Sequence, residues 1–178
     1  CERNNQHEVL ALVAKVGTFA VERLKTVIKN MPEFTLHDDT HIFNMLTIIG
    51  KLIPQENMRK LSTPDLFMLI VSVFLHDIGM APDEKHILAW KNQLPETEYD
   101  EELKEEREKF ARFRLTYTHQ LADIERLEAE QEFSKAQLLE DYIVTEYIRT
   151  THSIRAREII AKYWAGEIVY QDTDLTEN

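Results

Sequence analysis

Apolar residues recur at intervals of three and four along most of the chain, which is the pattern of amphipathic helices. Over residues 9–28 this pattern predicts one long helix that ends near Met31-Pro32. A second predicted helix has Thr35 as its cap and stops at Pro54. His41 lies on an apolar stripe of this helix, so we expect its side chain to face inward. The other members of the stripe are Met45, Ile48 and Leu52.

A third helix is predicted where residues 66–75 are almost all apolar, and such a helix would be buried on most sides. Ser62 or Thr63 can cap its start. The helix ends at the pair His76-Asp77, and we expect Gly79 to adopt the positive φ angle that stops a helix.

The rest of the chain also has helical patterning. A fourth helix is predicted from about Asp83 to Leu94, and two more over Ser134–Thr150 and Ser153–Trp164. Between them, residues 95–132 are rich in Glu and Arg and are predicted to form a charged helical insertion, which is either a solvated face or a lid or partner-binding element. Only four glycines and five prolines occur, so we predict an all-α fold, a bundle of about six or seven helices.

The composition argues against several classes of function. Thirty-two acidic and 21 basic residues give a net charge of −11, which repels nucleic acids and anionic membranes. The one cysteine, Cys1, allows neither a disulfide framework nor a thiolate zinc site. We find no apolar run of roughly 20 residues and expect a cytoplasmic protein with no membrane partner. A length of 178 residues fits a single domain over 1–178, and the termini lead us to expect a fragment of a longer protein.

The pair His76-Asp77 stands at the end of the predicted buried helix. A carboxylate in an apolar environment must be paired, hydrogen-bonded or bound to a metal. An imidazole beside a carboxylate offers two ligands to a divalent ion such as Mn, Fe, Co, Ni or Zn. His41, from the second helix, and His152, at the start of the last, can join this pair. A single histidine on an apolar face is usually a hydrogen-bonded core residue, but here several candidate ligands occur together.

The run Leu75-His76-Asp77-Ile78-Gly79-Met80 resembles the core motif of the HD-domain metal-dependent phosphohydrolases, and the segment 41–45 resembles their first-histidine helix. The resemblance extends from about Phe34 to Trp164 and implies an HD-domain-like helical bundle that binds one or two divalent ions. The order of the motifs also resembles HD domains that precede GHKL-type ATPase modules in bacterial proteins. An attached ATPase domain or a homo-oligomer is therefore an expected partner.

The resemblance also implies roles for single residues. His41, His76 and Asp77 are the implied metal ligands, and Asp77 would bridge two ions if two bind. The last ligand of the family is an Asp, which is either Asp123 or a residue outside this chain. His37, one turn before His41, resembles the leaving-group acid of the cyclic-nucleotide phosphodiesterases, or is an exposed helix residue.

Three further residues complete the predicted site. His152 is a second candidate acid for the leaving group. Arg149 and Lys85 are candidates to bind phosphate, because both are cations close in sequence to the predicted ligands.

The function implied is hydrolysis of a phosphoester in a phosphorylated small molecule, such as a nucleotide or cyclic nucleotide. A divalent ion, with Mg also a candidate, would activate the water. Two alternatives stay open at this point. One is a catalytically inactive sensor of nucleotide or metal that regulates an attached domain, and the other is a helical interaction module.

Overall fold

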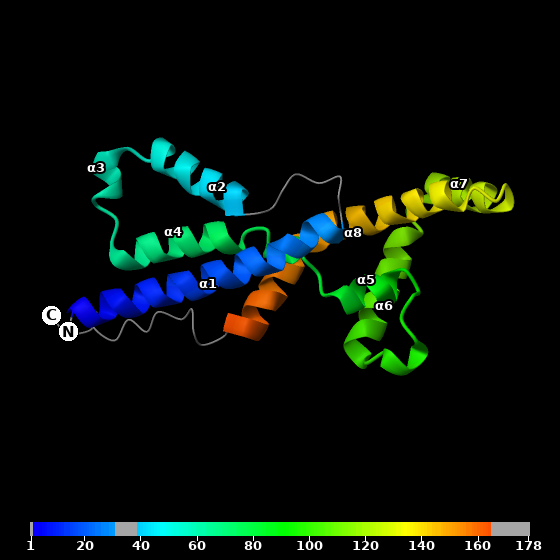
Figure 1. Cartoon of the computed structure of the whole chain (residues 1–178), viewed down its shortest axis with the longest axis horizontal. Coiled ribbons are helices and arrows are strands. Elements are labelled where there is room, and N and C mark those ends of the chain that lie inside the picture. The colour runs from blue at the N-terminus through cyan, green and yellow to red at the C-terminus, as the bar shows by residue number, and fades with distance from the viewer. Residues whose placement is uncertain (1, 31–38, 165–178) are drawn as a thin grey trace. The chain divides into compact units, whose positions relative to one another are not determined.

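The computed structural model describes residues 2–30 and 39–164, and every regular element in these residues is a helix (Figure 1). The predicted all-α fold is confirmed. The helices are α1 (Glu2–Asn30), α2 (Asp39–Leu52), α3 (Gln55–Met58), α4 (Thr63–Leu75), α5 (Glu84–Trp90), α6 (Glu101–Arg114), α7 (Thr118–Ala129) and α8 (Phe133–Trp164), with 3₁₀ turns η1 (Ile78–Met80) and η2 (Glu96–Glu98).

The chain divides into two compact units. The first comprises residues 1–81 and 152–178, and the second comprises residues 82–151. The expectation of a single domain over 1–178, with an insertion at 95–132, stays a prediction.

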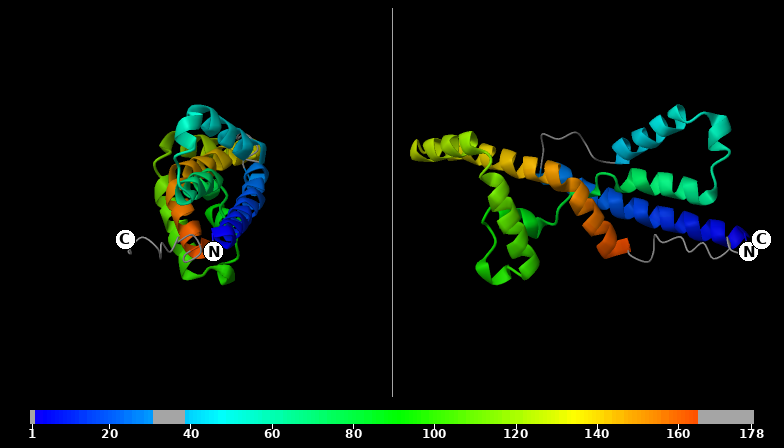
Figure 2. Two further views of the ribbon diagram at one scale, coloured as in Figure 1. Left: turned by 90° about the vertical axis from the view of Figure 1, so that its left-hand side faces the viewer. Right: turned by 180° about the vertical axis from the view of Figure 1, so that it is seen from behind.

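The core of the first unit lies where α1 packs along α4, and the two helices run side by side in Figures 1 and 2. Val16, Ala20 and Leu24 of α1 are completely buried, at intervals of four that place them on one face of the helix. The end of α8 adds Ala156, Ile159 and Trp164 to this core. The long first helix predicted from the sequence is therefore confirmed.

Helix α4 begins at the predicted cap. The Ser62 hydroxyl accepts a hydrogen bond from the backbone N–H of Asp65, and the Asp65 carboxylate accepts one in return from the backbone N–H of Ser62. This reciprocal pair satisfies two N–H groups that the first helical turn leaves without partners. The Ser62 hydroxyl also donates to the Asp65 carboxylate at 2.6 Å, and this bond, together with the one from the Ser62 backbone N–H, lowers the pKa of the Asp65 carboxyl.

Gly79 has a different role from the one expected. Its φ angle lies outside the left-handed region, so it does not stop α4 by a positive φ. A Cβ atom at this position would instead lie 1.9 Å from the backbone oxygen of His152 and 2.7 Å from the backbone nitrogen of Ala156. Gly79 therefore allows η1 to approach the backbone of α8 closely.

Helix α8 is continuous where two helices were predicted, so the break proposed between Thr150 and Ser153 is wrong. The hydroxyls there bond to carbonyls within the helix: Thr150 donates to Glu146 at 2.8 Å and Thr151 donates to Tyr147 at 2.6 Å. A hydroxyl that bonds back to its own helix is not available as a cap for a new one.

The fourth predicted helix is shorter than expected, because α5 ends at Trp90 rather than near Leu94. Asn92 has a φ angle of 53°, and the N–H of Gln93 donates to the carbonyl of Leu88 at 2.8 Å. A left-handed residue followed by this backward hydrogen bond closes a helix, and Asn tolerates the conformation better than most residues do.

Helix α2 is more exposed than its apolar stripe predicted. Ile42 is buried, but the side chains of Ile48 and Leu52 are 50% and 73% exposed. The inward orientation predicted for these two residues is therefore wrong. The cap predicted at Thr35 lies outside the described residues.

One part of the core of the second unit is aromatic, and another groups Ala89, Leu94, Tyr99 and Leu103. Tyr147 of α8 packs against Trp90 with ring centroids 5.1 Å apart, against Phe110 at 5.3 Å and against Phe113 at 5.1 Å. Helix α5 packs on α6, whose start is capped by the carboxylate of Asp100, an acceptor for the N–H of Leu103.

Contrary to expectation, one stretch, Thr63–Trp90, is long and apolar enough by length and composition to cross a membrane. The structure divides it among α4, η1 and α5, and its residues Phe67, Val71 and Leu75 pack into the core of the first unit. A core helix passes the same test, so the stretch is weak evidence for a membrane span. The cytoplasmic location stays a prediction.

Candidate metal centre

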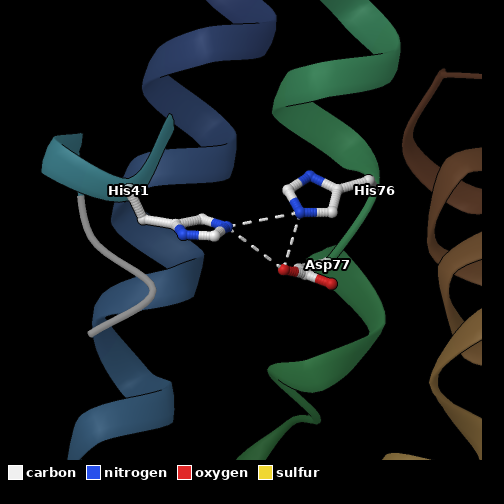
Figure 3. A group of neighbouring side chains, drawn as sticks. All are labelled: His41, His76 and Asp77. Atoms are coloured by element: carbon white, nitrogen blue, oxygen red, sulfur yellow. Dashed lines mark hydrogen bonds and ion pairs between the residues drawn. The ribbon is translucent and has the colours of Figure 1, made fainter. Parts of the chain in front are cut away.

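Three side chains predicted as metal ligands converge in the first unit (Figure 3). Nε2 of His41 lies 3.4 Å from Nε2 of His76 and 3.6 Å from Oδ2 of Asp77. Nε2 of His76 lies 2.7 Å from the same Asp77 oxygen. Two ring nitrogens and one carboxylate oxygen thus face a common point.

These donors come from two different helices. His41 belongs to the first turns of α2, whereas His76 caps the end of α4 in a helical conformation (φ −58°, ψ −39°). Asp77 leaves the helix with φ −104° and ψ 8°, in the bridge region that active-site residues often occupy. The change of direction at Asp77 lets two adjacent residues aim at one point, which consecutive residues within a helix do not do.

The tautomer of His76 follows from its hydrogen bonds. Its Nδ1 lies 2.7 Å from the carbonyl oxygen of Val73. A carbonyl only accepts, so Nδ1 carries a proton and donates it, and Nε2 is the nitrogen that faces His41 and Asp77. Without a metal, the hydrogen bond from His76 to Asp77 raises the pKa of the imidazole, the bond to Val73 also raises it, and partial burial opposes both.

The chemistry of this donor set fits a divalent ion. Ligand atoms bound at about 2.0–2.2 Å to one ion lie about 2.8–3.6 Å from one another, and the three measured separations, 2.7, 3.4 and 3.6 Å, are close to this range. Two imidazoles and a carboxylate suit Mn, Fe, Co, Ni or Zn. The bond from Nδ1 of His76 to a backbone carbonyl is the usual outer support of a metal-bound histidine.

The side chains are also accessible in the way a reactive centre requires. His41 and His76 are 30% and 31% exposed, and Asp77 is 17% exposed. The carboxylate is thus the most buried of the three, and a small molecule can approach the imidazoles from solvent.

The remaining predicted residues are placed as follows. His152 is half-buried in α8, within the first unit. Asp123 is exposed on α7 in the second unit, and its carboxylate accepts a hydrogen bond of 2.9 Å from Arg126. Its part in metal binding stays a prediction. His37 lies outside the described residues.

The two cations predicted to bind phosphate belong to the second unit. Lys85 is exposed on α5, and Arg149 is exposed on α8, where its Nε lies 3.6 Å from the Glu146 carboxylate. Their role in binding a substrate stays a prediction.

The sequence did not indicate that two arginines contact the turn beside the site. Arg155 donates from a terminal nitrogen to the carbonyl of Gly79 at 2.9 Å, and Arg23 donates from Nε to the carbonyl of Ala81 at 3.0 Å. These pairs are 76 and 58 residues apart in the chain, and no local pattern reveals such a contact.

A hollow of about 550 Å³ lies in the second unit, between α5, α6, α7 and α8. Its three cationic side chains already form ion pairs with carboxylates, so the hollow indicates a particular ligand less clearly than the His-His-Asp group does. The pairs are Lys91 with Asp141, Arg107 with Glu96, and Arg114 with Glu140.

Comparison with known proteins supports an HD-like domain. No curated protein and no solved structure matches the chain. A family model described as HD-CE matches residues 31–178, which include His41, His76 and Asp77. The match covers well over half of the chain and supports the HD-like character predicted from the sequence. The chain therefore belongs to the HD-CE family.

Proposed function

We propose that this chain is a metal-dependent phosphohydrolase domain that hydrolyses a phosphoester. The observation that carries the proposal is the convergence of His41, His76 and Asp77, whose donor atoms all lie within 4.8 Å of one another. Imidazole and carboxylate donors at a solvent-accessible point are the ligands of hydrolytic metal centres.

A divalent ion held there supplies an activated water and polarises the phosphoryl oxygen of the substrate. The chain's own residues hold the donors in place. Val73 fixes the tautomer of His76, so that Nε2 points into the centre. Asp77 brings the negative charge that offsets the ion, and it is the residue that would bridge a second ion.

The substrate class we propose is a phosphorylated small molecule, such as a nucleotide or cyclic nucleotide. Arg149 and Lys85 are proposed to bind phosphate, and His37 or His152 to protonate the leaving group. Asp123 is the proposed further ligand, and it must exchange its ion pair with Arg126 for the metal. A cytoplasmic location and an attached ATPase domain or homo-oligomer complete the proposal.

One observation favours a second candidate, a non-catalytic sensor of metal or nucleotide. Among the residues that the structure describes, the metal-type cluster contains three donors, one fewer than the four-ligand pattern expected from the resemblance. A sensor needs binding but no complete catalytic set.

The test uses the whole chain, a panel of nucleotides and cyclic nucleotides, and added Mn²⁺ or Mg²⁺. We expect release of phosphate or opening of the cyclic ester, and its loss in Asp77→Ala. His119→Ala is the matched control, because His119 is exposed on α7 and should leave the rate unchanged. Product formation that survives in Asp77→Ala contradicts the proposed centre, whereas metal binding without any hydrolysis supports the sensor.

Asp123→Asn tests the further ligand separately, by metal affinity. A weaker affinity identifies Asp123 as a ligand, and an unchanged affinity removes it from the set.

A further inference from the structure

The turn that follows Asp77 is held by arginines from both ends of the chain. Turn η1 consists of Ile78, Gly79 and Met80, all buried. Arg155 of α8 donates to the Gly79 carbonyl at 2.9 Å, and Arg23 of α1 donates to the Ala81 carbonyl at 3.0 Å. The carbonyls of Gly79 and Ala81 are thus tied to two different helices.

These bonds are stronger than ordinary backbone contacts. Hydrogen bonds from a charged group to a neutral acceptor are worth more than neutral ones, and both donors are partly buried, where water competes less. The planar guanidinium also restricts the direction of the bond, which an ammonium does not.

The backbone at Asp77 depends on this turn. The carbonyl of Asp77 accepts from the N–H of Met80 at 2.8 Å, so the turn hydrogen bond begins at the ligand itself. Asp77 holds φ −104° and ψ 8°, values that a residue in a turn commonly adopts. A shift of the turn therefore rotates the Asp77 side chain away from the two imidazoles.

We infer that Arg155 and Arg23 are positioning residues for the metal centre: they fix η1 and thereby aim Oδ2 of Asp77 at the point shared with His41 and His76. Neither arginine touches the ion in this account. The inference rests on the proposed metal centre, and it assigns a function to two residues that the sequence alone did not connect with the site.

The close helix crossing explains why Arg155 reaches the turn. Gly79 lies against the backbone of His152 and Ala156, so Arg155, one of the residues between them on α8, is brought beside the Gly79 carbonyl. The contact therefore requires both residues: Gly79 allows the close approach of the turn to α8, and Arg155 donates the hydrogen bond.

The experiment is a Co²⁺ titration of the whole chain, read by visible absorption, which reports both affinity and ligand geometry. Wild type, Arg155→Gln, Arg155→Lys and Arg23→Gln are compared. The matched control is Arg157→Gln, an exposed position on the same helix. The unfolding midpoint of each variant is measured in parallel.

Loss of an outer supporting contact typically weakens metal binding 10–100-fold, and we expect Arg155→Gln to fall in about this range with an altered Co²⁺ spectrum. Arg155→Lys should recover part of the affinity, because it keeps one charged donor. Arg157→Gln should match wild type. A merely structural role would lower the unfolding midpoint and leave the spectrum unchanged.

Wild-type affinity and spectrum in Arg155→Gln would overturn the inference while leaving the metal centre intact. If Arg155→Gln does not fold, Arg23→Gln decides the question by the same two readouts. Absence of Co²⁺ binding by the wild type would instead overturn the proposed centre itself, and the inference with it.

Discussion

A single methyl group added at Gly79 should destabilise the first unit far more than the same change at another glycine. The Cβ of Gly79→Ala would meet three backbone atoms of α8: the His152 oxygen at 1.9 Å, the Ala156 nitrogen at 2.7 Å and the His152 carbonyl carbon at 2.8 Å. Backbone atoms of a helix do not move aside singly, so η1 and α8 must separate.

The change in the free energy of unfolding is the sum of two destabilising contributions and one stabilising contribution. Overpacking of a tight contact costs about 1–3 kcal/mol, and the weakened bond from Arg155 to Gly79 adds to it about 1 kcal/mol or more. Replacing Gly by Ala returns about 0.4–1 kcal/mol through the unfolded chain. The net loss is about 1–4 kcal/mol, which for a chain of this size lowers Tm by roughly 2–16 °C.

Gly50→Ala is the matched control. Gly50 lies within α2 on an exposed face, and a Cβ there meets nothing within 4 Å. Ala is favoured over Gly in a helix by about 1 kcal/mol, so this variant should unfold about 2–4 °C higher than wild type.

The unfolding temperature of Gly17→Ala should lie between those of Gly79→Ala and Gly50→Ala. Its Cβ would come 2.9 Å from Cζ of Phe74, the far end of a side chain that can shift slightly. Thermal unfolding followed by circular dichroism orders the three variants. A Gly79→Ala variant that unfolds at or above the wild-type temperature would refute the close crossing of η1 and α8 on which the contact between Arg155 and Gly79 depends.

Two other predictions concern the ends of α4. Ser62→Ala removes the cap hydrogen bond and should lower the unfolding free energy by about 1 kcal/mol. Ser72 is exposed on the same helix, so Ser72→Ala should have little effect on the unfolding free energy. Equal unfolding free energies for the two variants would show that the cap does not contribute. In metal-free protein the pKa of His76 is raised above 6.5, so its protonated form contributes stability that is complete below that pH and is lost as the pH rises through the folded-state pKa. Urea unfolding in chelator from pH 5.5 to 9 should show this loss, and Asp77→Asn, which weakens the main cause of the raised pKa, should flatten it; an equally steep profile in Asp77→Asn would contradict the assigned cause.

Features set by neighbouring residues in the chain could be predicted from the sequence. The cap at Ser62 depends on residues three apart in the chain. The predicted end of α4 at His76 is also found, although not through a positive φ angle at Gly79. The convergence of His41, His76 and Asp77 was predicted from the motif and the helical stripe, and the structure brings the three together.

Features set by contacts between distant segments could not be predicted in this way. The sequence predicts a local helix stop at Gly79, because its neighbours in the chain do not show that α8 passes against it. Arg155 and Arg157 look alike in the sequence, and the contact with Gly79, 76 residues away, distinguishes Arg155. The apolar residues of α2 suggested burial, yet Leu52 is 73% exposed.

The break predicted within α8 failed for a third reason. Thr and Ser are favoured as caps, but their hydroxyls also bond to carbonyls one turn back. The hydroxyls of Thr150 and Thr151 bond to carbonyls one turn back, and the sequence alone does not show whether such a residue caps a new helix or continues the same one.

The most direct test of the central claim is the metal content of the chain itself. The protein is stripped with chelator, dialysed against Mn²⁺ or Zn²⁺, and analysed for bound metal by elemental analysis, beside His76→Ala, Asp77→Ala and the exposed control His119→Ala. We expect stoichiometric metal in wild type and His119→Ala, and its loss in the other two variants. A wild type that retains no ion, or an Asp77→Ala variant that retains as much as wild type, would contradict the metal centre.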